Sequence, residues 1–419
     1  MMEYMYDIED GKMVVNVIGL GYIGLPTALI FAASGIKVVA TDIDEQKVEN
    51  LKNGRFTFGE NGLQEIYDKA VNTGIEFGIE CKEADVYIIA LPTPYNKRSR
   101  TINSKYVISG VESALKKCRN NSIVIVESTV SPGTIDNCVL PLVEKKNKTG
   151  DMHIAIAHAP ERIIPGNMLY ELVSNNRIIG AYDTSVAEKV KRLYEVFCKG
   201  NIILTDIRTA ELTKVAENTY RDINIAYANE LVKICREAKV DVHELIKIAN
   251  MHPRVNILSP GPGVGGHCIS VDPWFLVGDY PEIANLILTA RRVNDSMPEY
   301  VLGRISEIME KENITSLEQV GLYGLTYKEN VDDIRESPSL QLISCMKKHA
   351  AKGVRTYDPF VKNQIIDGQY FDLNDFLSGL KMIVILVGHD EIVINQSLLH
   401  DIVVYDTRDV LSVEGKYGI

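Results

Sequence analysis

One pattern near the start of the chain, a strand followed by a glycine turn and a helix, restricts the possible folds more than any other feature. The apolar run 14–18 leads into Gly19, Gly21 and Gly24, which fit the spacing G-x-G-x-x-G, and apolar residues at helical spacing follow. A second apolar run ends at Asp42, 18 residues after Gly24. Because the hydrophobic period changes from that of a strand to that of a helix and back, the pattern predicts a βαβ unit.

The same pattern predicts a ligand. Glycines in the turn let a pyrophosphate approach backbone N–H groups at the positive end of the helix. The Asp42 carboxylate can accept hydrogen bonds from an adenosine ribose. Ile43 and Asp44 follow without an arginine to bind a 2′-phosphate, so NAD is expected rather than NADP. The alternative is a glycine turn that only packs the helix closely against the strand.

Short apolar runs continue through the first 200 residues, at 86–92, 122–129, 153–160 and 201–205, with helix-like segments between several of them. Strands that are buried on both faces have this composition. We therefore expect a doubly wound parallel sheet, and we assign residues 1–205 to an NAD-binding Rossmann domain.

A long helix is expected after this domain. From Asp206 to about Lys239 the chain contains no Gly or Pro and repeats apolar residues at helical spacing. A further helical stretch is expected at 282–311. Because a long helix between two globular parts commonly packs against a second copy, we expect residues 206–311 to form a central domain that makes a homodimer or a higher homo-oligomer.

Strand-and-turn patterns return in the last hundred residues. One apolar run ends near Gly324, a later one leads to Asp358, and two more follow at 382–388 and 402–407. This order echoes the first domain and predicts that residues 312–419 form a second Rossmann-like domain. The expected fold class is α/β, with two Rossmann-like doubly wound parallel-sheet domains joined by a long-helix central domain.

The charge balance limits the partners of the chain. It has 45 Lys plus Arg against 56 Asp plus Glu, a net charge of -11. A nucleic acid or a membrane surface requires broad positive potential, so neither is expected as a partner. No apolar run approaches the roughly 20 residues of a membrane span, and the acidic opening segment does not resemble a secretory signal. A cytoplasmic protein is expected.

The seven cysteines include no C-x-x-C pair, so neither a disulfide framework nor a zinc site is expected, and no metal is predicted. Cys268 differs from the rest because it lies in the glycine-rich segment GPGVGGHCISVD, where small residues permit close substrate approach and backbone amides can steady an oxyanion. Cys268 is therefore the candidate nucleophile. The other six are expected to be inert buried thiols, and the adjacent His267 is expected to have a supporting role.

Three polar residues share one face of the expected long helix. Lys214, Asn218 and Arg221 stand at positions i, i+4 and i+7. A cation, an amide and a second cation on one stripe suit a polar, anionic ligand. The alternative is an ordinary solvated helix face.

Seven blocks of sequence, in order, resemble the UDP-glucose/GDP-mannose dehydrogenase family from end to end. They read GLGYIGLP, LPTP, ESTVSPGT, APERIIPG, ELTKVAENTYRDINIAYANEL, GPGVGGHCISVDPWFL and GLTYKENVDDIRESPS. The segments HPRVNIL, GGHCISVDPWFL and NTYRDINIA are most similar to the members that oxidise UDP-N-acetyl-D-mannosamine. Members that use UDP-glucose usually have a Lys before the aspartate that follows the cysteine, whereas this chain has Val271.

The resemblance implies an oxidation of the sugar C6 from alcohol to carboxylate, with two NAD per sugar and no release of the aldehyde. An aldehyde has no hydroxyl-bearing carbon from which a second hydride can leave, but its thiohemiacetal with a cysteine has one. Oxidation of that adduct gives a thioester, which water hydrolyses to the acid. By this resemblance Cys268 forms the adduct.

The resemblance also assigns roles to five further residues. Lys214 exchanges the alcohol proton or steadies the developing alkoxide, and Asn218 donates to the same oxygen. Glu161, together with Thr129, positions or activates water. Asp272 orients Lys214 and that water.

Two sets of binding residues are carried over by the same resemblance. The residues matched to NAD contacts are Gly19, Gly21, Tyr22, Ile23, Gly24, Asp42, Thr93, Thr129 and Arg335, the last offering its guanidinium to the phosphates. The residues matched to the UDP-sugar are Glu161, Arg162, Lys214, Asn218, Arg221, His252, Arg254, Gly265, Tyr327 and Lys328. For a single arginine the alternative is a surface ion pair, and His252 has the alternative of an ordinary loop histidine.

Other functions remain open at this point. Within the family the sugar could be UDP-N-acetylglucosamine or UDP-glucose. A two-electron dehydrogenase of the β-hydroxyacid type also joins a Rossmann domain to a long helix with a Lys-Asn pair, and it would not need Cys268. A non-catalytic nucleotide-binding protein is the alternative outside the enzymes, although the coexistence of a nucleophile, an acid/base and a stabilising amide argues against it.

Overall fold

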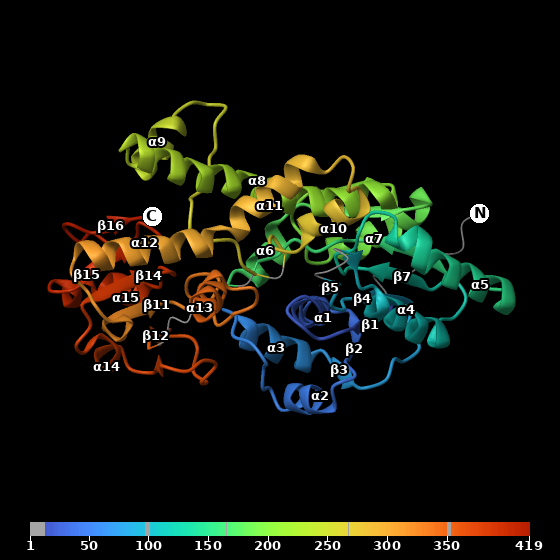
Figure 1. Ribbon diagram of the computed structural model, residues 1–419. Helices are drawn as coiled ribbons and strands as arrows, with labels where there is room; N and C mark the ends of the chain where they lie inside the picture. The colour runs from blue at the N-terminus through green and yellow to red at the C-terminus, as the bar shows by residue number, and fades with distance from the viewer. Residues whose placement is uncertain (1–12, 97–100, 165, 267, 350–352) are drawn as a thin grey trace. The chain divides into compact units, whose positions relative to one another are not determined.

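The computed structural model describes residues 13–96, 101–164, 166–266, 268–349 and 353–419 (Figure 1). The chain divides into two compact units, residues 1–216 and 217–419, and each is described by itself below. Within the described ranges, no helix combines the length and the apolar composition that crossing a bilayer requires.

The N-terminal unit is built on an eight-stranded sheet of strand order β10-β9-β8-β7-β4-β1-β2-β3. All neighbours pair in parallel except β8 and β9, which are antiparallel. The expectation of a wholly parallel sheet is therefore wrong at this one pair, while the doubly wound core of the sheet is as predicted. The strands are β1 Val14–Ile18, β2 Lys37–Thr41, β3 Glu76–Gly78, β4 Val86–Ile89, β7 Ile123–Val126, β8 Ala155–His158, β9 Arg177–Ala181 and β10 Ile202–Thr205.

Helices cover both faces of this sheet, as its apolar strands require. On β4, Ile88 packs into one core together with residues of α1, α3 and α7, whereas Tyr87 and Ile89 pack into the other with residues of α4 and α5. Alternate residues of a strand point to opposite faces, so a strand buried on both sides is apolar throughout. The helices are α1 Gly24–Ala33, α2 Glu45–Lys52, α3 Leu63–Asn72, α4 Lys105–Lys117, α5 Leu140–Gly150, α6 Met168–Ser174 and α7 Thr184–Glu195, and a two-stranded hairpin joins β5 Tyr95–Asn96 to β6 Thr101–Ile102.

The long helix predicted from Asp206 to about Lys239 is α8, Ile207–Ala238. It contains the division between the two units. The single helical stretch expected at 282–311 is instead two helices, α11 Asn285–Asp295 and α12 Met297–Lys311. Pro298 explains the break, because its ring nitrogen cannot donate to the preceding turn and proline is tolerated in the first turn of a new helix. The other helices of this region are α9 Val242–Ala249 and α10 Asp272–Asp279.

A second sheet, of six parallel strands, forms the end of the C-terminal unit, with strand order β13-β12-β11-β14-β15-β16. Its two faces have separate cores, one shared with α8, α9, α12 and α13 and the other with α14 and α15. The second α/β domain expected from the sequence is thus present. Its elements are β11 Val320–Tyr323, α13 Pro338–Lys348, β12 Arg355–Tyr357, β13 Gln369–Tyr370, α14 Leu373–Leu377, β14 Met382–Ile385, α15 Asp390–Ile394, β15 Val403–Asp406 and β16 Tyr417–Gly418.

Candidate active site

The predicted glycine turn connects β1 to α1, and its first and third glycines are required by packing. Gly19 has a φ of 96°, in the left-handed region that favours glycine. A Cβ on Gly24 would stand 1.8 Å from the carbonyl oxygen of Gly19, so no larger residue fits where the helix begins. These two glycines let the first turn of α1 lie directly against the end of the strand.

Gly21 is different, because nothing in the described protein lies within 4 Å of where its Cβ would stand. Packing therefore does not require glycine at this position, whereas the close approach of a pyrophosphate to the backbone does. Tyr22 stacks on Phe58 with ring centroids 4.3 Å apart, and Ile23 is the residue that precedes α1. The turn thus fits a dinucleotide at the N-terminus of α1, and the alternative of a purely structural glycine turn explains Gly19 and Gly24 but not Gly21.

Asp42 follows β2 and lies beside the same turn. Its Oδ2 accepts from the backbone N–H of Leu20 at 2.9 Å and from Lys47 Nζ at 2.7 Å, and its Oδ1 accepts from the backbone N–H of Asp44 at 3.1 Å. Asp42 and Gly19 line a cavity of about 370 Å³ together with residues of α4, such as Tyr106. The structure therefore brings the two ends of the predicted motif to one cavity, and it adds Lys47, which the sequence reasoning missed.

Three more predicted residues follow the carboxyl ends of β4, β7 and β8, the edge at which ligands bind in open α/β sheets. Thr93 follows β4 and is buried, Thr129 follows β7 and is half-buried, and Glu161 follows β8 and is buried. Because parallel strands end at a common edge, the sheet topology places all three at the edge that carries the glycine turn.

Glu161 is bound to a buried arginine that the sequence analysis did not identify. Its Oε2 accepts from the guanidinium of Arg177, the first residue of β9, and its Oε1 accepts from the backbone N–H of Arg162 at 2.7 Å. The side chain of Arg162 in turn donates to the carbonyl of Asn176. Arg177 also lies 3.6 Å from Glu127, the residue that follows β7.

Lys214 and Asn218 lie one turn apart on α8, and each is only 6 % exposed. The alternative of a solvated helix face is therefore wrong for these two residues, while Arg221 is half-buried. The start of α8 is fixed by Glu211, whose buried carboxylate accepts from the backbone N–H groups of Gly133 at 2.5 Å and Ile135 at 2.9 Å. Burial raises the pKa of Glu211 to about 7.

Cys268 is exposed, and it lies at the start of a turn that leads into α10. The carbonyl of Cys268 accepts from the backbone N–H of Asp272 at 2.8 Å. Asp272 is buried at the first position of α10, and its Oδ2 accepts from the Asn218 amide at 2.6 Å. The structure thus links three predicted residues in one unit: Asn218 on α8, Asp272 on α10 and Cys268 in the turn between the glycine loop and that helix.

The other cysteines only partly match the expectation of buried thiols. Cys118, Cys198 and Cys235 are buried, whereas Cys81, Cys138 and Cys345 are half-buried. For these three the expectation is wrong: Cys81 packs at the edge of a core and Cys345 lines a cavity beside α13. Burial raises the pKa of the Cys118 thiol to about 12, so it is inert. His267, for which a supporting role was expected, lies outside the described residues.

The glycine loop before Cys268 is packed against the loop that follows β11. A Cβ on Gly265 would stand 2.7 Å from the Cβ of Tyr327, and Gly266, with a φ of 85°, lies as close to the tyrosine ring. The backbone N–H of Gly266 donates to the carbonyl of Arg335 at 2.9 Å. Predicted substrate and cofactor residues that are about 60 positions apart in sequence therefore meet in this unit.

Two other predicted cations have defined settings. The guanidinium of Arg335 forks onto Asp333, with Nε 2.9 Å from Oδ1 and Nη2 2.6 Å from Oδ2. Lys328 is half-buried, and its carbonyl accepts from the hydroxyl of Thr326. The fork onto Asp333 orients Arg335 rather than leaving it to move freely.

His252 and Arg254 are exposed neighbours in the loop that follows α9, where the backbone N–H of Arg254 donates to His252 Nδ1 at 3.3 Å. Asn224 of α8 holds this loop, because its amide donates to the Asn256 carbonyl at 2.7 Å and its Oδ1 accepts from Leu258 at 2.9 Å. The loop is thereby attached one turn after Arg221 on α8.

A buried ion pair holds α8 to α11 in the C-terminal unit. Arg291 contacts Asp222 at 2.5 Å, and Asn294 donates to the same carboxylate at 2.8 Å. Asn294 also accepts from Asn229, whose Oδ1 accepts from the backbone N–H of Gly261 at the start of the glycine loop. Burial raises the pKa of Asp222 to about 6 despite the arginine.

The sequence reasoning missed Glu127, Arg177, Asp222 and Arg291, although a signal existed. Glu127 and Arg177 directly adjoin wholly apolar strands, in IVIVEST and NRIIGA. A charge that borders a strand buried on both faces must find a partner, because burying it alone is costly. The sequence could not say which partner, since the paired residues are distant along the chain.

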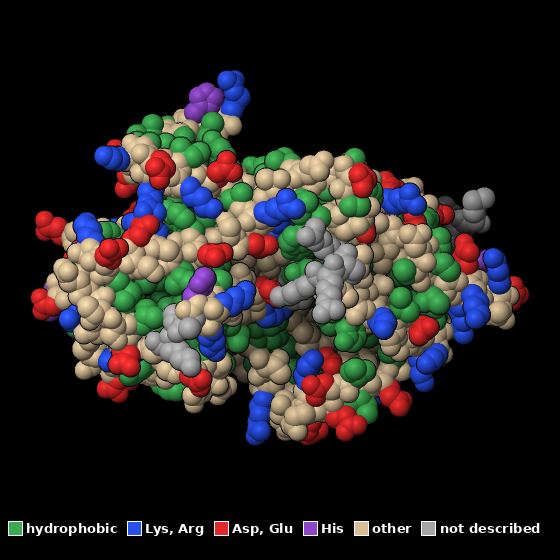
Figure 2. Space-filling view, viewed as in Figure 1, with side chains coloured by type: hydrophobic (Ala, Val, Ile, Leu, Met, Phe, Trp, Pro, Cys, Tyr) green, Lys and Arg blue, Asp and Glu red, His purple; other side chains and the backbone are tan. Residues whose placement is uncertain are grey.

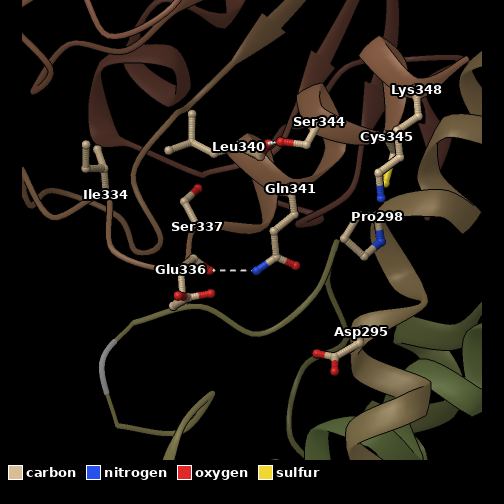
Figure 3. A pocket seen from close by; sticks show the side chains of 10 residues that line it. All are labelled: Asp295, Pro298, Ile334, Glu336, Ser337, Leu340, Gln341, Ser344, Cys345 and Lys348. Carbon is tan, nitrogen blue, oxygen red and sulfur yellow. Dashed lines mark hydrogen bonds between the residues drawn. The ribbon is translucent and has the colours of Figure 1, made fainter. Parts of the chain in front are cut away.

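The C-terminal unit has a cavity of about 400 Å³ beside α13, drawn in Figure 3. Glu336 and Gln341 border it, and the Gln341 amide donates to the Glu336 carbonyl at 3.0 Å. The ten residues that line it do not include a predicted site residue, although Glu336 directly follows Arg335. This cavity is therefore not the one at the predicted chemistry.

The described residues contain no group of three or more His, Cys, Asp or Glu side chains arranged to hold a metal ion. Figure 2 shows side chains of both charge signs interspersed over the visible face.

Comparison with family models matches three stretches of the chain. Residues 13–198 match the UDP-glucose/GDP-mannose dehydrogenase family, NAD binding domain; residues 208–296 match its central domain; and residues 321–413 match its UDP binding domain.

Similar proteins carry related names. A UDP-N-acetyl-D-mannosamine dehydrogenase of Methanocaldococcus jannaschii is 44 % identical over 90 % of this chain and 86 % of its own. An NDP-N-acetyl-D-galactosaminuronic acid dehydrogenase of Ralstonia solanacearum is 38 % identical over 97 % and 98 % of the two chains. The solved structure of a UDP-D-ManNAc dehydrogenase from Pyrococcus horikoshii has a TM-score of 0.89 and 36 % identity, and the match covers 97 % of this chain and 99 % of the other.

Proposed function

The chain belongs to the UDP-glucose/GDP-mannose dehydrogenase family, and on that premise we propose that it oxidises UDP-N-acetyl-D-mannosamine at C6 to the uronate. It is an NAD-dependent oxidoreductase of the UDP-sugar dehydrogenase class. The choice of sugar is supported by relatives named UDP-N-acetyl-D-mannosamine dehydrogenase, while a relative named for N-acetyl-D-galactosaminuronic acid marks the nearest alternative.

The observation that carries the proposed chemistry is the setting of Cys268. Its thiol is exposed on a loop of small residues, and its backbone is tied through Asp272 to the buried amide of Asn218. A cysteine that served only as packing would be buried, as Cys118 and Cys235 are. An exposed thiol beside fixed polar groups suits a nucleophile.

NAD, when bound, accepts the hydrides that leave the sugar carbon. The residues that would hold it are Gly19, Gly21, Tyr22, Ile23, Gly24, Asp42, Thr93, Thr129 and Arg335. Gly21 leaves room for the pyrophosphate at the N-terminus of α1, and Asp42 keeps acceptor capacity for ribose hydroxyls next to Lys47.

The protein groups then perform the proton transfers and the covalent step. Lys214 takes the proton of the C6 hydroxyl or steadies its developing negative charge, and Asn218 donates to the same oxygen. The Cys268 sulfur forms a bond to the aldehyde carbon and gives a thiohemiacetal, whose oxidation leaves a thioester. Asp272 keeps the Asn218 amide in place, with 2.6 Å between their polar atoms.

Hydrolysis of the thioester completes the reaction. A water oxygen forms a bond to the acyl carbon, the C–S bond breaks, and the sulfur leaves as the Cys268 thiolate. Glu161, aided by Thr129, positions this water and accepts its proton. The carboxylate suits this role because its protein partners leave acceptor positions for water.

We further propose that Arg162, Arg221, His252, Arg254, Gly265, Tyr327 and Lys328 bind the UDP-sugar. Among them the basic residues supply local positive charge to a chain of net charge -11. The proposed division of labour is NAD binding by residues 1–205, catalysis and dimerisation by 206–311, and UDP-sugar binding by 312–419.

A homodimer through α8 is part of the proposal, as is a location in the cytoplasm. Tyr220, Tyr227 and Ile234 are exposed by 61 %, 54 % and 54 % and stand seven residues apart on α8. Apolar residues at this spacing form one stripe along a helix, which suits packing against a second helix. Sedimentation velocity should show a dimer for the wild type and a monomer for Tyr227→Glu, and a monomeric wild type at micromolar concentration would contradict the dimer.

The decisive test of the function counts NADH per sugar and compares sugars. UDP-N-acetyl-D-mannosamine, UDP-N-acetylglucosamine and UDP-glucose are assayed side by side, and the first should give the highest kcat/KM with two NADH per sugar. A single NADH with an aldehyde or ketone product would favour a two-electron dehydrogenase instead. Cys268→Ser should bind UDP-sugar and NAD while uronate formation falls by about 10³-fold or more, and unchanged uronate formation would rule out the covalent step.

A further inference from the structure

Two buried, charged residues of the N-terminal unit, Glu127 and Arg177, have no role in the proposed mechanism, although both lie beside Glu161. These three residues are named here the buried triad. Arg177 is 4 % exposed, and both carboxylates are buried beside it. Three ionisable groups in a protein interior are costly to desolvate, so a fold that keeps them has a use for them or a set of bonds that offsets the cost.

The bonds of the triad fix the Glu161 carboxylate in one orientation. One oxygen accepts from the Arg177 guanidinium, and the other accepts from the backbone N–H of Arg162 at 2.7 Å. The backbone N–H of Glu161 also donates to the carbonyl of Glu127 at 3.4 Å. A carboxylate has about four acceptor positions, so two remain, and their directions are set by the two that are occupied.

Arg177 is itself held from several sides. Glu127 lies 3.6 Å from its guanidinium, the Tyr194 ring lies 4.5 Å from the guanidinium carbon, and the Phe197 ring lies 5.4 Å from it. A planar guanidinium can bridge two carboxylates and stack on an aromatic face at the same time, which a lysine ammonium cannot do. The side chain therefore has little freedom to move away from Glu161.

The triad is tied to the helix of the glycine turn. The hydroxyl of Thr27, on the first turn of α1, donates to one oxygen of Glu127 at 3.2 Å, and the Tyr194 hydroxyl donates to the other at 2.9 Å. A chain of bonds thus runs from α1 through Glu127 and Arg177 to Glu161. These bonds fix the orientation of Glu161 relative to α1, the helix whose N-terminus would bind the NAD pyrophosphate.

We propose that Arg177 is the positioning residue of Glu161, and that Glu127 is the counter-charge which keeps Arg177 buried and aimed at it. The inference rests on the proposed function, in which Glu161 positions the water that hydrolyses the thioester. The triad fixes the Glu161 carboxylate so that its two remaining acceptor positions point toward that water. In the same step the water oxygen bonds to the acyl carbon, the C–S bond breaks, and the water proton passes to Glu161, with no change of oxidation state.

The charges of the triad agree with this role. With both carboxylates ionised, the group carries one net negative charge, so Arg177 does not cancel the ability of Glu161 to accept a proton. Burial and the neighbouring Glu161 charge raise the pKa of Glu127 to about 7, although Arg177 acts in the opposite direction.

The test separates thioester hydrolysis from the oxidation steps. Wild type, Arg177→Lys, Glu127→Gln and Glu161→Gln are mixed rapidly with NAD and UDP-N-acetyl-D-mannosamine, and NADH is followed by its absorbance. Samples quenched in acid are examined by intact-protein mass for the acyl adduct. We expect Arg177→Lys to form two NADH per subunit in a fast phase and then to turn over about 100-fold more slowly than wild type, with acyl-enzyme accumulated as in Glu161→Gln. Glu127→Gln should show the same pattern with a smaller loss.

A matched control tests the possibility that loss of any buried arginine has this effect. Arg291 is 2 % exposed and also contacts two carboxylates, Asp222 and Asp295, in the other unit. Arg291→Lys should lower the midpoint of thermal unfolding and the fraction of active protein without raising the share of acyl-enzyme per active subunit. A purely structural role for Arg177 predicts the same behaviour for Arg177→Lys.

The possible outcomes are distinct. If Glu161→Gln accumulates the acyl-enzyme but Arg177→Lys and Glu127→Gln hydrolyse it at the wild-type rate, the inference is overturned and the proposed function stands. If wild type forms no NADH from UDP-N-acetyl-D-mannosamine, UDP-N-acetylglucosamine or UDP-glucose, the proposed function fails and the inference fails with it. Accumulation in both triad variants, and not in Arg291→Lys, supports the inference.

Discussion

The first strand of each sheet, β1 and β11, leads into the same kind of glycine turn, but the aspartate beside each turn has different partners. After β1, the backbone N–H of Gly19 donates to the Thr41 carbonyl at 2.8 Å and that of Leu20 donates to Asp42 at 2.9 Å. After β11, the backbone N–H of Gly324 donates to the Tyr357 carbonyl at 2.8 Å. The φ angles of the two glycines are 96° and 93°.

The aspartates of the two turns are equivalent in position but not in setting. Asp358, like Asp42, follows the second strand and accepts from a backbone N–H of its turn, that of Leu325, at 2.6 Å. Asp358 also accepts from the backbone N–H of Thr326 at 3.0 Å and pairs with His389 at 3.1 Å, and the side chains of Asp358 and His389 are fully buried. Asp42 pairs instead with the partly exposed Lys47 and lines a cavity.

The helices that follow the turns differ as well. In the first sheet α1 begins five residues after Gly19, whereas in the second α13 begins 14 residues after Gly324. Only the first turn therefore presents a helix N-terminus to a phosphate. A strand, a glycine and a distant aspartate therefore specify a Rossmann-like turn. Dinucleotide binding also needs a carboxylate that faces a cavity and a helix that begins directly after the turn.

The two sheets also share a strand order. Counted from the first strand of each, both contain the Rossmann order 3-2-1-4-5-6, to which the N-terminal sheet adds β9 and β10. The order echoed in the sequence is thus present in the structure, although Asp358 of the second turn is paired with a histidine and Asp42 of the first is not.

Removal of Asp358, the aspartate closed by His389, should lower the stability of the fold more than any other change considered. Asp358→Ala leaves His389 and two backbone N–H groups without their buried acceptor, and we expect a loss of about 3–5 kcal/mol in the free energy of unfolding. Chemical denaturation measures it, with Asp367→Ala, at an exposed position in the turn before β13, as the control. A loss below about 1 kcal/mol would show that Asp358 is not structural.

The pH dependence of stability should have opposite signs for two buried carboxylates, Glu127 beside the first sheet and Asp358 beside the second. Folded Glu127 keeps its proton up to about pH 7, whereas the ordinary value for a glutamate is 4.5, so the folded state binds an extra proton between these values. Stability is therefore lost as pH rises through this window, by up to about 3 kcal/mol at pH 8. Glu127→Gln should reduce this loss in denaturation curves at pH 5, 6.5 and 8, while Glu211, whose pKa burial also raises to about 7, keeps its own share.

The contribution of Asp358 to stability should depend on pH with the opposite sign. Burial would raise its pKa, but the bond to His389 and two backbone N–H groups outweigh burial, and the pKa lies below the ordinary aspartate value of 3.8. Its stabilising contribution is present above that value and is lost as pH falls through the folded pKa. Equal slopes for wild type and Glu127→Gln from pH 5 to 8 would contradict the contribution assigned to Glu127.

The open aspartate should matter for the ligand more than for the fold. Asp42→Ala removes a charged acceptor from the ribose side of the proposed site, and we expect NAD to bind more weakly by about 1.5–3 kcal/mol. Titration calorimetry with NAD measures it, and Asp42→Asn, which keeps one acceptor, should lose less. NAD binding by Asp42→Ala at wild-type strength would remove the functional difference between the two turns.

The smallest expected change in stability is at Gly21. Its Cβ position is open, so Gly21→Ala should change the free energy of unfolding by no more than about 0.5 kcal/mol while it weakens NAD binding. Gly303→Ala, at another open position, controls for the change of residue type and should leave NAD binding intact. Unaltered NAD binding by Gly21→Ala would place the pyrophosphate elsewhere.

Much of the fold was predictable because its signals are local. The apolar runs of β1, β2, β4 and β7 and the helical spacing of α8 follow from burial and periodicity alone, and all of these elements are present. The antiparallel β9 was not identified, because a strand's direction depends on the path of the chain around it. The break between α11 and α12 had a local cause, Pro298. It was not predicted because apolar residues continue at helical spacing on both sides of the break.

The candidate site was predictable where one residue type in one setting implies a chemistry. Cys268 in a glycine loop and Lys214 with Asn218 on one helix face are of this kind, and their roles remain proposals. Arg177 and Glu127 were not identified, because each is an ordinary charge at the end of a strand until the sheet brings them to Glu161.

The α/β class, the glycine turn with its aspartate, and the separation of a long helix from two strand-rich regions all followed from the amino-acid sequence alone. These depend on the alternation of apolar residues and on backbone freedom at glycine, which are properties of neighbours along the chain. Only the tertiary structure decided which buried charges are paired, which aspartate stays open, and which thiol is exposed. Those outcomes depend on desolvation and on partners up to 100 residues away, such as Thr27 and Glu127, and no local pattern encodes them.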